Sequence, residues 1–275
     1  MENKSYKKIL EFIKILALEA GKLIVEKRKN NELSLSLKND IELVTTADLA
    51  ADQLIKKMIQ SHYPDHRILS EELSPDFSND DIYKNPLWII DPIDGTVNYA
   101  HHHHQVSVSI AFFDKGTVQV GVVHSPFQKE TFWACLGEGA FMNDTPIKVS
   151  ECSLMKSALI ATGFPYQKDH IKHLVNRLES VLKNYQDIRR IGSAALDICW
   201  VAMGRLEGYY ETVKPWDMAA GFLIAQEAGA LTGNLYPSKI NIPSGCNGND
   251  LVVATPQIFD HLVDLLIKAD QSSSQ

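Results

Sequence analysis

Residues 88–96 read Trp-Ile-Ile-Asp-Pro-Ile-Asp-Gly-Thr, and this stretch decides the fold. Its apolar beginning, with Leu87 before it, predicts a short buried strand. We expect the strand to end at Asp91, because Pro92 has no N–H to donate to a sheet and Gly95 permits a tight turn. The pattern therefore predicts a strand that delivers carboxylates at its end.

Three oxygen donors are expected to converge beyond that strand: the carboxylates of Asp91 and Asp94 and the carbonyl group of Ile93. Oxygen-only ligands select hard cations such as Mg²⁺. Thr96 follows at the expected start of a helix, where backbone N–H groups can hold a phosphate. The alternative is a turn with solvated acidic side chains, and the nine-residue pattern taken whole favours the metal site.

Two further acidic positions are candidates for the same site. Glu71-Glu72 follows the apolar pair Ile68-Leu69. Alone it would be an exposed acidic pair, but beside the aspartate turn one of the two becomes a candidate for a third metal-ligand carboxylate. Asp217 opens a predicted helix with small residues at 219–221. It is either a helix N-cap or a further ligand, and the small residues would let the helix approach another backbone closely.

Outward from this stretch, helices and strands alternate. The periodicity predicts helices at 6–29, 47–61, 171–183, 193–203, 218–228 and 257–268, and strands at 106–113, 118–124, 131–135, 158–162, 188–191, 207–211 and 251–254. Thr45 or Thr46 is the expected N-cap of the second helix. The order of elements indicates a layered α/β architecture with a mixed sheet, in one domain over 1–275 whose candidate lobes are 1–150 and 151–275.

Composition limits the class of protein. The 275 residues are 45% apolar and 22% charged, as in globular proteins with a sizeable core. The net charge of -7 argues against a general nucleic-acid binder, but not against a phosphate substrate, because bound metal ions reverse the local field. The four cysteines form no CxxC pair, and no segment reads as a signal peptide or membrane span. We expect a cytoplasmic protein with reduced thiols and no membrane partner.

Four segments together resemble the inositol monophosphatase family. The first is 88–96, continued by Asn98-Tyr99, and the second is Lys214-Pro-Trp-Asp-Met-Ala-Ala-Gly221. Val44-Thr-Thr-Ala-Asp48 and Leu69-Ser-Glu-Glu72 match two more family segments, in the right order and spacing. The resemblance covers nearly the whole chain. It implies an α+β fold in a layered α-β-α-β sandwich of mixed sheets and helices, like that of fructose-1,6-bisphosphatase.

The resemblance implies a set of metal ligands. Glu71, Asp91 and the Ile93 carbonyl would hold the first Mg²⁺. The second Mg²⁺ would be held by Asp91, Asp94 and Asp217. Glu71 would contribute to a third, more weakly held ion. Two or three ions per active site are therefore expected.

The resemblance also implies catalytic and substrate-binding residues. Asp48 and Thr96 would form a hydrogen-bonded pair near the attacking water, with Glu71 as the third catalytic residue. Gly95 and Thr96 amides would contact the phosphate, and Glu211 would bind a substrate hydroxyl. The implied substrate-binding set is Asp94, Gly95, Thr96, Ala195, Glu211 and Asp217. Lys38 matches a lysine on a loop that closes the site.

The implied activity is Mg²⁺-dependent hydrolysis of a small phosphate monoester. Val97-Asn98-Tyr99 after the Gly-Thr pair favours myo-inositol 1-phosphate over nucleotide substrates. Histidinol phosphate, fructose 1,6-bisphosphate and other sugar phosphates stay open as alternatives. A haloacid-dehalogenase-like phosphatase is disfavoured, because its two aspartates stand two residues apart, whereas Asp91 and Asp94 stand three apart.

Further properties follow from the resemblance alone. They are inhibition by lithium, a homodimer, and, for some bacterial members, a role in a transcription complex through a protein surface, without direct nucleic-acid binding. One departure from the family pattern is the run His101–His104, where the family commonly has one histidine. We expect this run to be either a solvated turn or an adventitious transition-metal site.

Overall fold

A computed structural model describes residues 2–30, 35–38, 42–73, 80–165, 171–238 and 242–272. The helices in these ranges are α1 (Glu2–Lys29), α2 (Thr46–His62), α3 (Thr96–Ala100), α4 (Ile171–Asn184), α5 (Ala194–Ala202), α6 (Pro215–Glu227) and α7 (Phe259–Ser272). All six helices predicted from periodicity are present, as is the short helix expected after Gly95. None of these described helices is long and apolar enough to cross a membrane.

The larger sheet has seven strands in the order β3-β4-β5-β6-β7-β8-β9. Its strands are β3 (Arg67–Ser70), β4 (Leu87–Asp94), β5 (Ser107–Asp114), β6 (Thr117–Ser125), β7 (Glu130–Cys135), β8 (Ala140–Met142) and β9 (Thr145–Ile147). Only β3 and β4 pair in parallel, and the other neighbours are antiparallel. The sheet is therefore an antiparallel meander with one parallel strand added at its edge.

The smaller sheet has five strands in the order β11-β10-β12-β14-β13. They are β10 (Leu159–Thr162), β11 (Asp187–Arg189), β12 (Gly208–Glu211), β13 (Leu231–Asn234) and β14 (Leu251–Ala254). β10 is parallel to β11 and β12, whereas β14 is antiparallel to β12 and β13. The C-terminal ends of β10 and β12 consequently lie side by side, which brings Gly163 next to Glu211.

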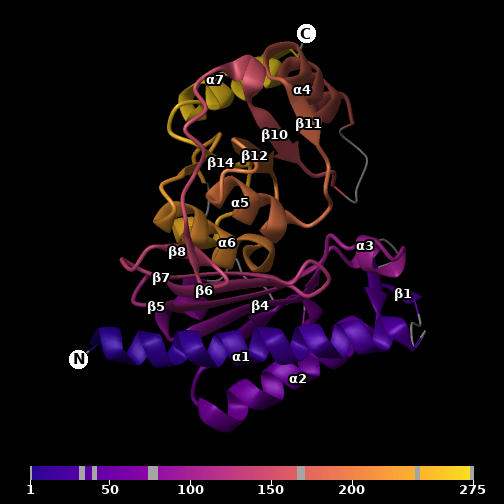
Figure 1. Cartoon of the computed structure of the whole chain (residues 1–275), viewed down its shortest axis with the longest axis vertical. Coiled ribbons are helices and arrows are strands. Elements are labelled where there is room, and N and C mark those ends of the chain that lie inside the picture. Colours follow the sequence, from indigo (N-terminus) through magenta and orange to yellow (C-terminus); the bar gives the residue numbers. More distant parts are fainter. Residues whose placement is uncertain are drawn as a thin grey trace.

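Helices and sheets form alternating layers (Figure 1). α1 and α2 cover one face of the larger sheet, α5 and α6 lie between the two sheets, and α4 and α7 cover the far face of the smaller sheet. One apolar cluster joins Ile89 of β4, Ala219 of α6 and Val253 of β14. Because this cluster contains residues from both sheets, we propose one domain for residues 1–275, with 1–150 and 151–275 as its lobes.

Strand β4 differs from the prediction that it ends at Asp91. It continues to Asp94, and its register against β5 shifts between the pairs Asp91↔Ser109 and Asp94↔Ser107. Two residues, Pro92 and Ile93, thus stand opposite one residue of β5. Such a bulge accommodates a proline that cannot donate to the ladder, and it re-aims the side chains around it. The metal-ligand candidates therefore sit on a bulged strand rather than in a turn after it.

Helix α6 approaches the larger sheet unusually closely, as the small residues at 219–221 predict. A Cβ atom built on Gly121 of β6 would lie 2.7 Å from the carbonyl oxygen of Ala220. Only glycine leaves room for that contact. The close approach holds α6, whose first turn carries Asp217, against the sheet that carries Asp91.

Several short elements were not predicted. They include the hairpin of β1 (Leu35–Lys38) and β2 (Glu42–Thr45), and the strands β3, β8, β9 and β13. Each has only three or four residues, too few to show a period of two. The N-cap of α2 is Thr45, one of the two predicted residues, and it forms a capping box with Asp48.

Candidate active site

Three carboxylates from three separate elements meet at the bulge of β4. Glu71 begins the 3-10 turn after β3, Asp91 lies in β4, and Asp217 lies in the first turn of α6. One oxygen of each lies within 4.8 Å of the others. Asp91 is buried, and Glu71 and Asp217 are half-buried. No other group of three or more acidic, histidine or cysteine side chains in the described ranges has this spacing.

The cluster concentrates negative charge where water is scarce. Burial, followed by the charges of Glu71, Asp94 and Asp217, raises the pKa of Asp91 well above its usual value. Burial and the charges of Glu71 and Asp94 likewise raise the pKa of Asp217. A divalent cation would relieve both effects at once, because it favours the ionised form of every carboxylate that it contacts. The oxygen-only donor set fits a hard cation of the Mg²⁺ type.

Backbone amides orient two of these carboxylates. Asp91 Oδ1 accepts a hydrogen bond from the Ile93 N–H at 2.9 Å, which closes the bulge on itself. Asp217 Oδ2 accepts one from the Lys214 N–H at 2.8 Å, as a residue in a capping box does. The N-cap of α6 is Lys214, so the prediction that Asp217 is the N-cap is wrong; Asp217 lies three positions later, accepts from the N-cap N–H and belongs to the acidic cluster.

Asp94 lies apart from the three-carboxylate cluster and against the start of α5. Its Oδ2 accepts hydrogen bonds from the Ser193 hydroxyl at 2.6 Å and the Ala195 N–H at 2.8 Å. Its Oδ1 accepts one from the Ala194 N–H at 3.2 Å. Burial raises the pKa of Asp94 to about 6, although these hydrogen bonds lower it. Asp94 thus links the β4 bulge to α5, and its role as a metal ligand stays a prediction.

Thr96 and Asp48 form the pair expected from the resemblance. Thr96 Oγ1 lies 3.1 Å from Asp48 Oδ1 and 3.0 Å from the carbonyl oxygen of Ile93, so its single proton is donated to one or the other. Asp48 also accepts from the N–H of Thr45 at 2.8 Å and from the Thr45 hydroxyl. Burial raises the pKa of Asp48 despite these bonds. A buried carboxylate with a raised pKa, within hydrogen-bond distance of a hydroxyl group, can accept a proton from that hydroxyl.

Gly95 is required by the turn between β4 and α3. Its φ of +92° lies in the left-handed region, and a Cβ atom there would be 2.9 Å from the Gln105 carbonyl oxygen and 3.0 Å from that of Gly192. Any other residue would be strained and would push these two backbone segments apart. The glycine keeps Thr96 beside Ile93 and Asp48.

A cavity of about 530 Å³ opens over these residues. This volume suits a small molecule, since ligand cavities are typically about 300–1,000 Å³. The sequence-predicted residues that line it are Glu71, Asp91, Ile93, Asp94, Gly95, Thr96, Glu211 and Asp217. Asp48 does not line the cavity, but it lies within hydrogen-bond distance of Thr96, which does. The Ala195 side chain is fully buried, and its neighbour Ala194 lines the cavity instead.

Glu211 stands at the end of β12. Its Oε2 accepts a hydrogen bond from the Tyr209 hydroxyl at 2.6 Å. Burial raises the pKa of Glu211 to about 7, although the Tyr209 bond and the charge of Arg190 lower it. Among the further lining residues that the sequence did not predict are Gly163, Arg190 and Asp197. A glycine, an arginine and a single aspartate inside a predicted helix carry no local signal that sets them apart.

Two predictions concern residues outside this cavity. The side chains of His101–His104 are exposed, the His104 ring stacks on Phe127, and the four form no group with metal-ligand spacing. This favours the solvated turn over the transition-metal site. The side chain of Lys38 lies outside the described residues.

Comparison with known proteins now decides the family. Residues 5–263 match the model of the inositol monophosphatase family. The chain belongs to this family. It is 37% identical over 251 residues to the Nus factor SuhB of Pasteurella multocida, covering 90% of this chain and 91% of that protein. It is 40% identical over 233 residues to the inositol-1-monophosphatase of Synechocystis sp., covering 79% of each chain.

Solved structures confirm the layered fold. The extragenic suppressor protein suhB of Bartonella henselae superposes with a TM-score of 0.85 at 31% identity, covering 95% of this chain and 99% of that chain. An inositol monophosphatase from Anabaena gives a TM-score of 0.81 at 32% identity, covering 96% of this chain and 97% of that chain. This family member is therefore a phosphatase with an inositol monophosphatase fold, and the cavity over the acidic cluster is its candidate active site.

Proposed function

We propose that this phosphatase hydrolyses myo-inositol 1-phosphate to inositol and phosphate with Mg²⁺ as its cofactor. One observation carries the proposal: the carboxylate oxygens of Glu71, Asp91 and Asp217 lie within 4.8 Å of one another beside a cavity of small-molecule size. The donor set fits Mg²⁺, with Ile93 and Asp94 as the proposed additional ligands for two or three ions. When bound, the ions supply an activated water and positive charge for the phosphate oxygens.

The protein's own residues have separate proposed tasks. Thr96 takes a proton from the attacking water and passes its own to Asp48, whose Oδ1 is 3.1 Å away. Glu71, which also lines the cavity, orients that water. The backbone amides of Gly95 and Thr96 hold the phosphate group, as the resemblance implies. Asp94 and Glu211 bind the alcohol part of the ester, where their oxygens can accept from hydroxyl groups.

The substrate is tested by phosphate release from a panel of esters. The panel contains inositol 1-phosphate, histidinol phosphate, fructose 1,6-bisphosphate and 3′-phosphoadenosine 5′-phosphate, each with Mg²⁺ and with EDTA. We expect the highest kcat/KM for inositol 1-phosphate, and no turnover in EDTA. Preference for histidinol phosphate or fructose 1,6-bisphosphate would keep the reaction class and replace the substrate. Equal turnover in EDTA would overturn the metal mechanism.

Lithium inhibition and a homodimer are further parts of the proposal. Lithium should inhibit at tens of millimolar, because a monovalent ion can replace a weakly held divalent one. Unchanged turnover at that concentration would contradict it. Light scattering should give the mass of two chains, and a monomer at all concentrations would refute the dimer. A cytoplasmic location stays a prediction from the sequence.

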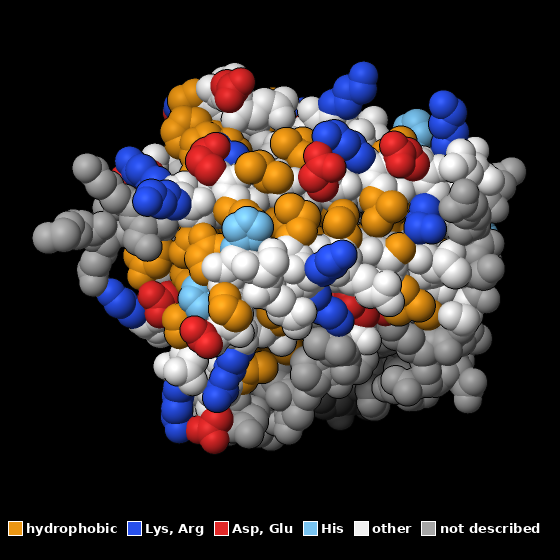
Figure 2. Space-filling view, turned by 90° about the horizontal axis from the view of Figure 1, so that it is seen from below, with side chains coloured by type: hydrophobic (Ala, Val, Ile, Leu, Met, Phe, Trp, Pro, Cys, Tyr) orange, Lys and Arg blue, Asp and Glu red, His pale blue; other side chains and the backbone are white. Residues whose placement is uncertain are grey.

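A second candidate function is a binding role in a transcription complex. It is favoured by the relative named Nus factor SuhB and by the resemblance to bacterial members with such a role. Figure 2 shows lysines, arginines and acids interspersed over the described part of the face formed by α1 and α2, so this part has no continuous basic surface. A protein partner therefore fits this face better than a nucleic acid does. Rescue of a deletion phenotype by the inactive Asp91→Asn protein would support the role, and failure of that rescue would count against it.

A further inference from the structure

Asp197 is a buried carboxylate that the proposed mechanism does not use. It lies in α5, lines the cavity, and is only 1% exposed. Its Oδ1 has no hydrogen-bond partner. Buried polar atoms in folded proteins are nearly always paired, so an exception beside a ligand cavity calls for a partner that arrives with the ligand.

The surroundings of Asp197 place it with the alcohol-binding residues. Its charge interactions are with Glu211, Asp94 and Arg190. Burial, then the charges of Glu211 and Asp94, raises the pKa of Asp197, and the charge of Arg190 lowers it. Asp197 and Glu211 therefore line the same part of the cavity.

The position of Glu211 in this part is enforced by Gly163. A Cβ atom on Gly163 would lie 2.0 Å from both Glu211 carboxylate oxygens. The Glu211 carboxylate thus occupies the space where any other residue at 163 would have a side chain, and the Tyr209 hydroxyl holds it there. Two carboxylates from different elements, Glu211 on β12 and Asp197 on α5, therefore line the same cavity.

We propose that Asp197 is a specificity-determining residue that pairs with a second hydroxyl group of the substrate's alcohol part, beside the hydroxyl that Glu211 takes. The inference deepens the proposed function and rests on it. The preferred substrate class is then the phosphate monoester of a polyol ring with hydroxyl groups on neighbouring carbons. Arg190 offsets part of the negative charge in this wall.

The test compares Asp197→Asn with the parent protein. For inositol 1-phosphate we expect KM to rise about 10- to 100-fold, the range of a hydrogen bond to a charged group, with kcat changed less. The inhibition constant of inorganic phosphate, which has no alcohol part, should stay within about twofold. The rise in KM should be smaller for histidinol phosphate than for inositol 1-phosphate. Asp260→Asn, an exposed acid on α7, is the matched control and should behave as the parent.

Thermal unfolding separates this role from a purely structural one. Replacing a buried carboxylate whose Oδ1 is unpaired should leave the melting temperature of Asp197→Asn unchanged or higher, whereas loss of a structural contact would lower it. An unchanged KM for inositol 1-phosphate, or an equal loss for phosphate and for the ester, would overturn the inference. If the parent hydrolyses none of the esters, the proposed function itself fails, and that outcome is distinct from a loss confined to the variant.

Discussion

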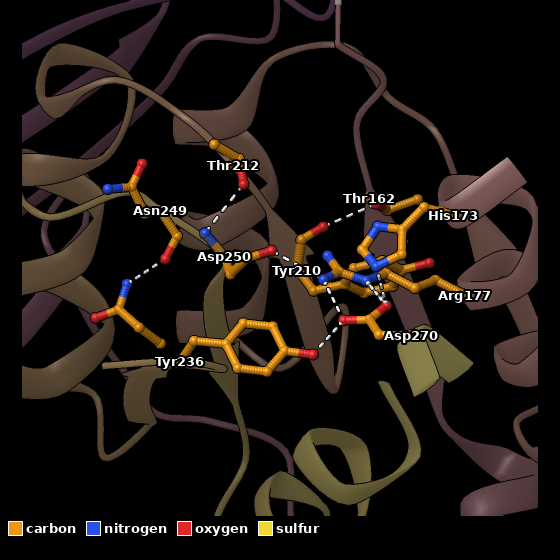
Figure 3. A network of polar contacts seen from close by, with 10 residues as sticks. Thr162, His173, Arg177, Tyr210, Thr212, Tyr236, Asn249, Asp250 and Asp270 are labelled. Carbon is orange, nitrogen blue, oxygen red and sulfur yellow. Dashed lines mark hydrogen bonds and ion pairs between the residues drawn. The ribbon is translucent and has the colours of Figure 1, made fainter. Parts of the chain in front are cut away.

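Asp270 and Asp91 are both buried carboxylates, but the side chains around them carry opposite charges: Asp270 faces cations and Asp91 faces other acids. Asp270 of α7 accepts hydrogen bonds from Arg177 Nε and Nη2, both at 2.7 Å, and from the Tyr236 hydroxyl at 2.6 Å (Figure 3). His173 Nε2 lies 2.6 Å from its Oδ1. Burial raises the pKa of Asp270, but the bonds from Arg177 and Tyr236 outweigh it, so the pKa is lowered. Asp91 instead faces other acids, and its pKa is raised.

The difference separates a structural site from a reactive one. In the network of Figure 3, Arg177 also bonds Asp250 Oδ1 at 2.9 Å, so one guanidinium serves two carboxylates. Every charge there has a partner within the protein, and α4, α7 and the start of β14 are tied together. At the β4 bulge, by contrast, the charges that act on Asp91 are those of Glu71, Asp94 and Asp217, which are acids too. A buried charge that the protein does not compensate marks the place where a ligand must do so.

The largest expected effect comes from removing one member of the uncompensated cluster. Asp91→Asn should lower kcat/KM by more than about 10³-fold, because it removes a metal ligand and charge stabilisation of the transition state. The free energy of unfolding of the metal-free protein should stay the same or rise, since charge repulsion is relieved. Phosphate release and urea denaturation measure the two quantities. A variant that loses stability but keeps activity would break the comparison.

The opposite result is expected in the compensated network. Arg177→Met should lower the free energy of unfolding by about 3–5 kcal/mol, because it leaves Asp270 buried without its cation. The folded fraction should retain most of the phosphatase activity. Urea denaturation of the metal-free protein gives the change, with Arg177→Lys as the charge-preserving control. A loss below about 1 kcal/mol would mean that the network does not stabilise the fold.

The pH dependence of stability should also separate the two regions. Asp94 and Glu211 have pKa values raised to about 6 and about 7, so the native state holds protons that the unfolded state releases. Their stabilising contribution is present below about pH 4 and is lost as the pH rises through 6 to 7. The lowered pKa of Asp270 acts in the other direction and costs stability only below about pH 4.

Melting temperatures from pH 4 to 8 check this prediction. The metal-free protein should become less stable between pH 5 and 7.5, and saturating Mg²⁺ should remove that fall by favouring the ionised carboxylates. Melting temperatures that rise with pH in the absence of metal would contradict the assignment of uncompensated acids.

Asp48 has features of both regions, and we expect the smallest effect from a change in its hydrogen-bond partner Thr45. It is buried without a cation, but it is hydrogen-bonded to Thr45 and Thr96. Thr45→Ala removes the capping hydroxyl and should cost about 1 kcal/mol of stability, whereas Thr45→Ser should cost little. Chemical denaturation distinguishes them. Equal losses for alanine and serine would show that the Thr45 methyl group, not its hydroxyl, stabilises the start of α2.

The parts of the site that could be predicted from the sequence are those marked by a local sequence pattern. Asp91 follows a run of apolar residues, and Asp217 precedes small residues that let helix α6 approach the larger sheet closely. The joint pattern of four segments then led to the family. The β4 bulge was missed because proline and glycine beyond a strand indicate a turn equally well. Short strands such as β13 have no measurable period.

The rest depends on contacts between distant segments. Asp197 looks like any polar residue of a helix, and only the fold shows that its Oδ1 is buried and unpaired beside the cavity. The bonds from the start of α5 to Asp94 join residues about a hundred positions apart, and the space that Gly163 leaves for Glu211 depends on parallel pairing of β10 and β12. Local patterns contain no information about such pairings.

Calorimetric titration of Mg²⁺ tests the central claim most directly. It compares the parent protein with Asp91→Asn and with Asp250→Asn, which removes a carboxylate from the compensated network at a positive-φ position that asparagine tolerates. We expect Mg²⁺ to bind to the parent and to Asp250→Asn, and binding to be lost in Asp91→Asn. Equal Mg²⁺ affinity of the parent and the folded Asp91→Asn protein would contradict it.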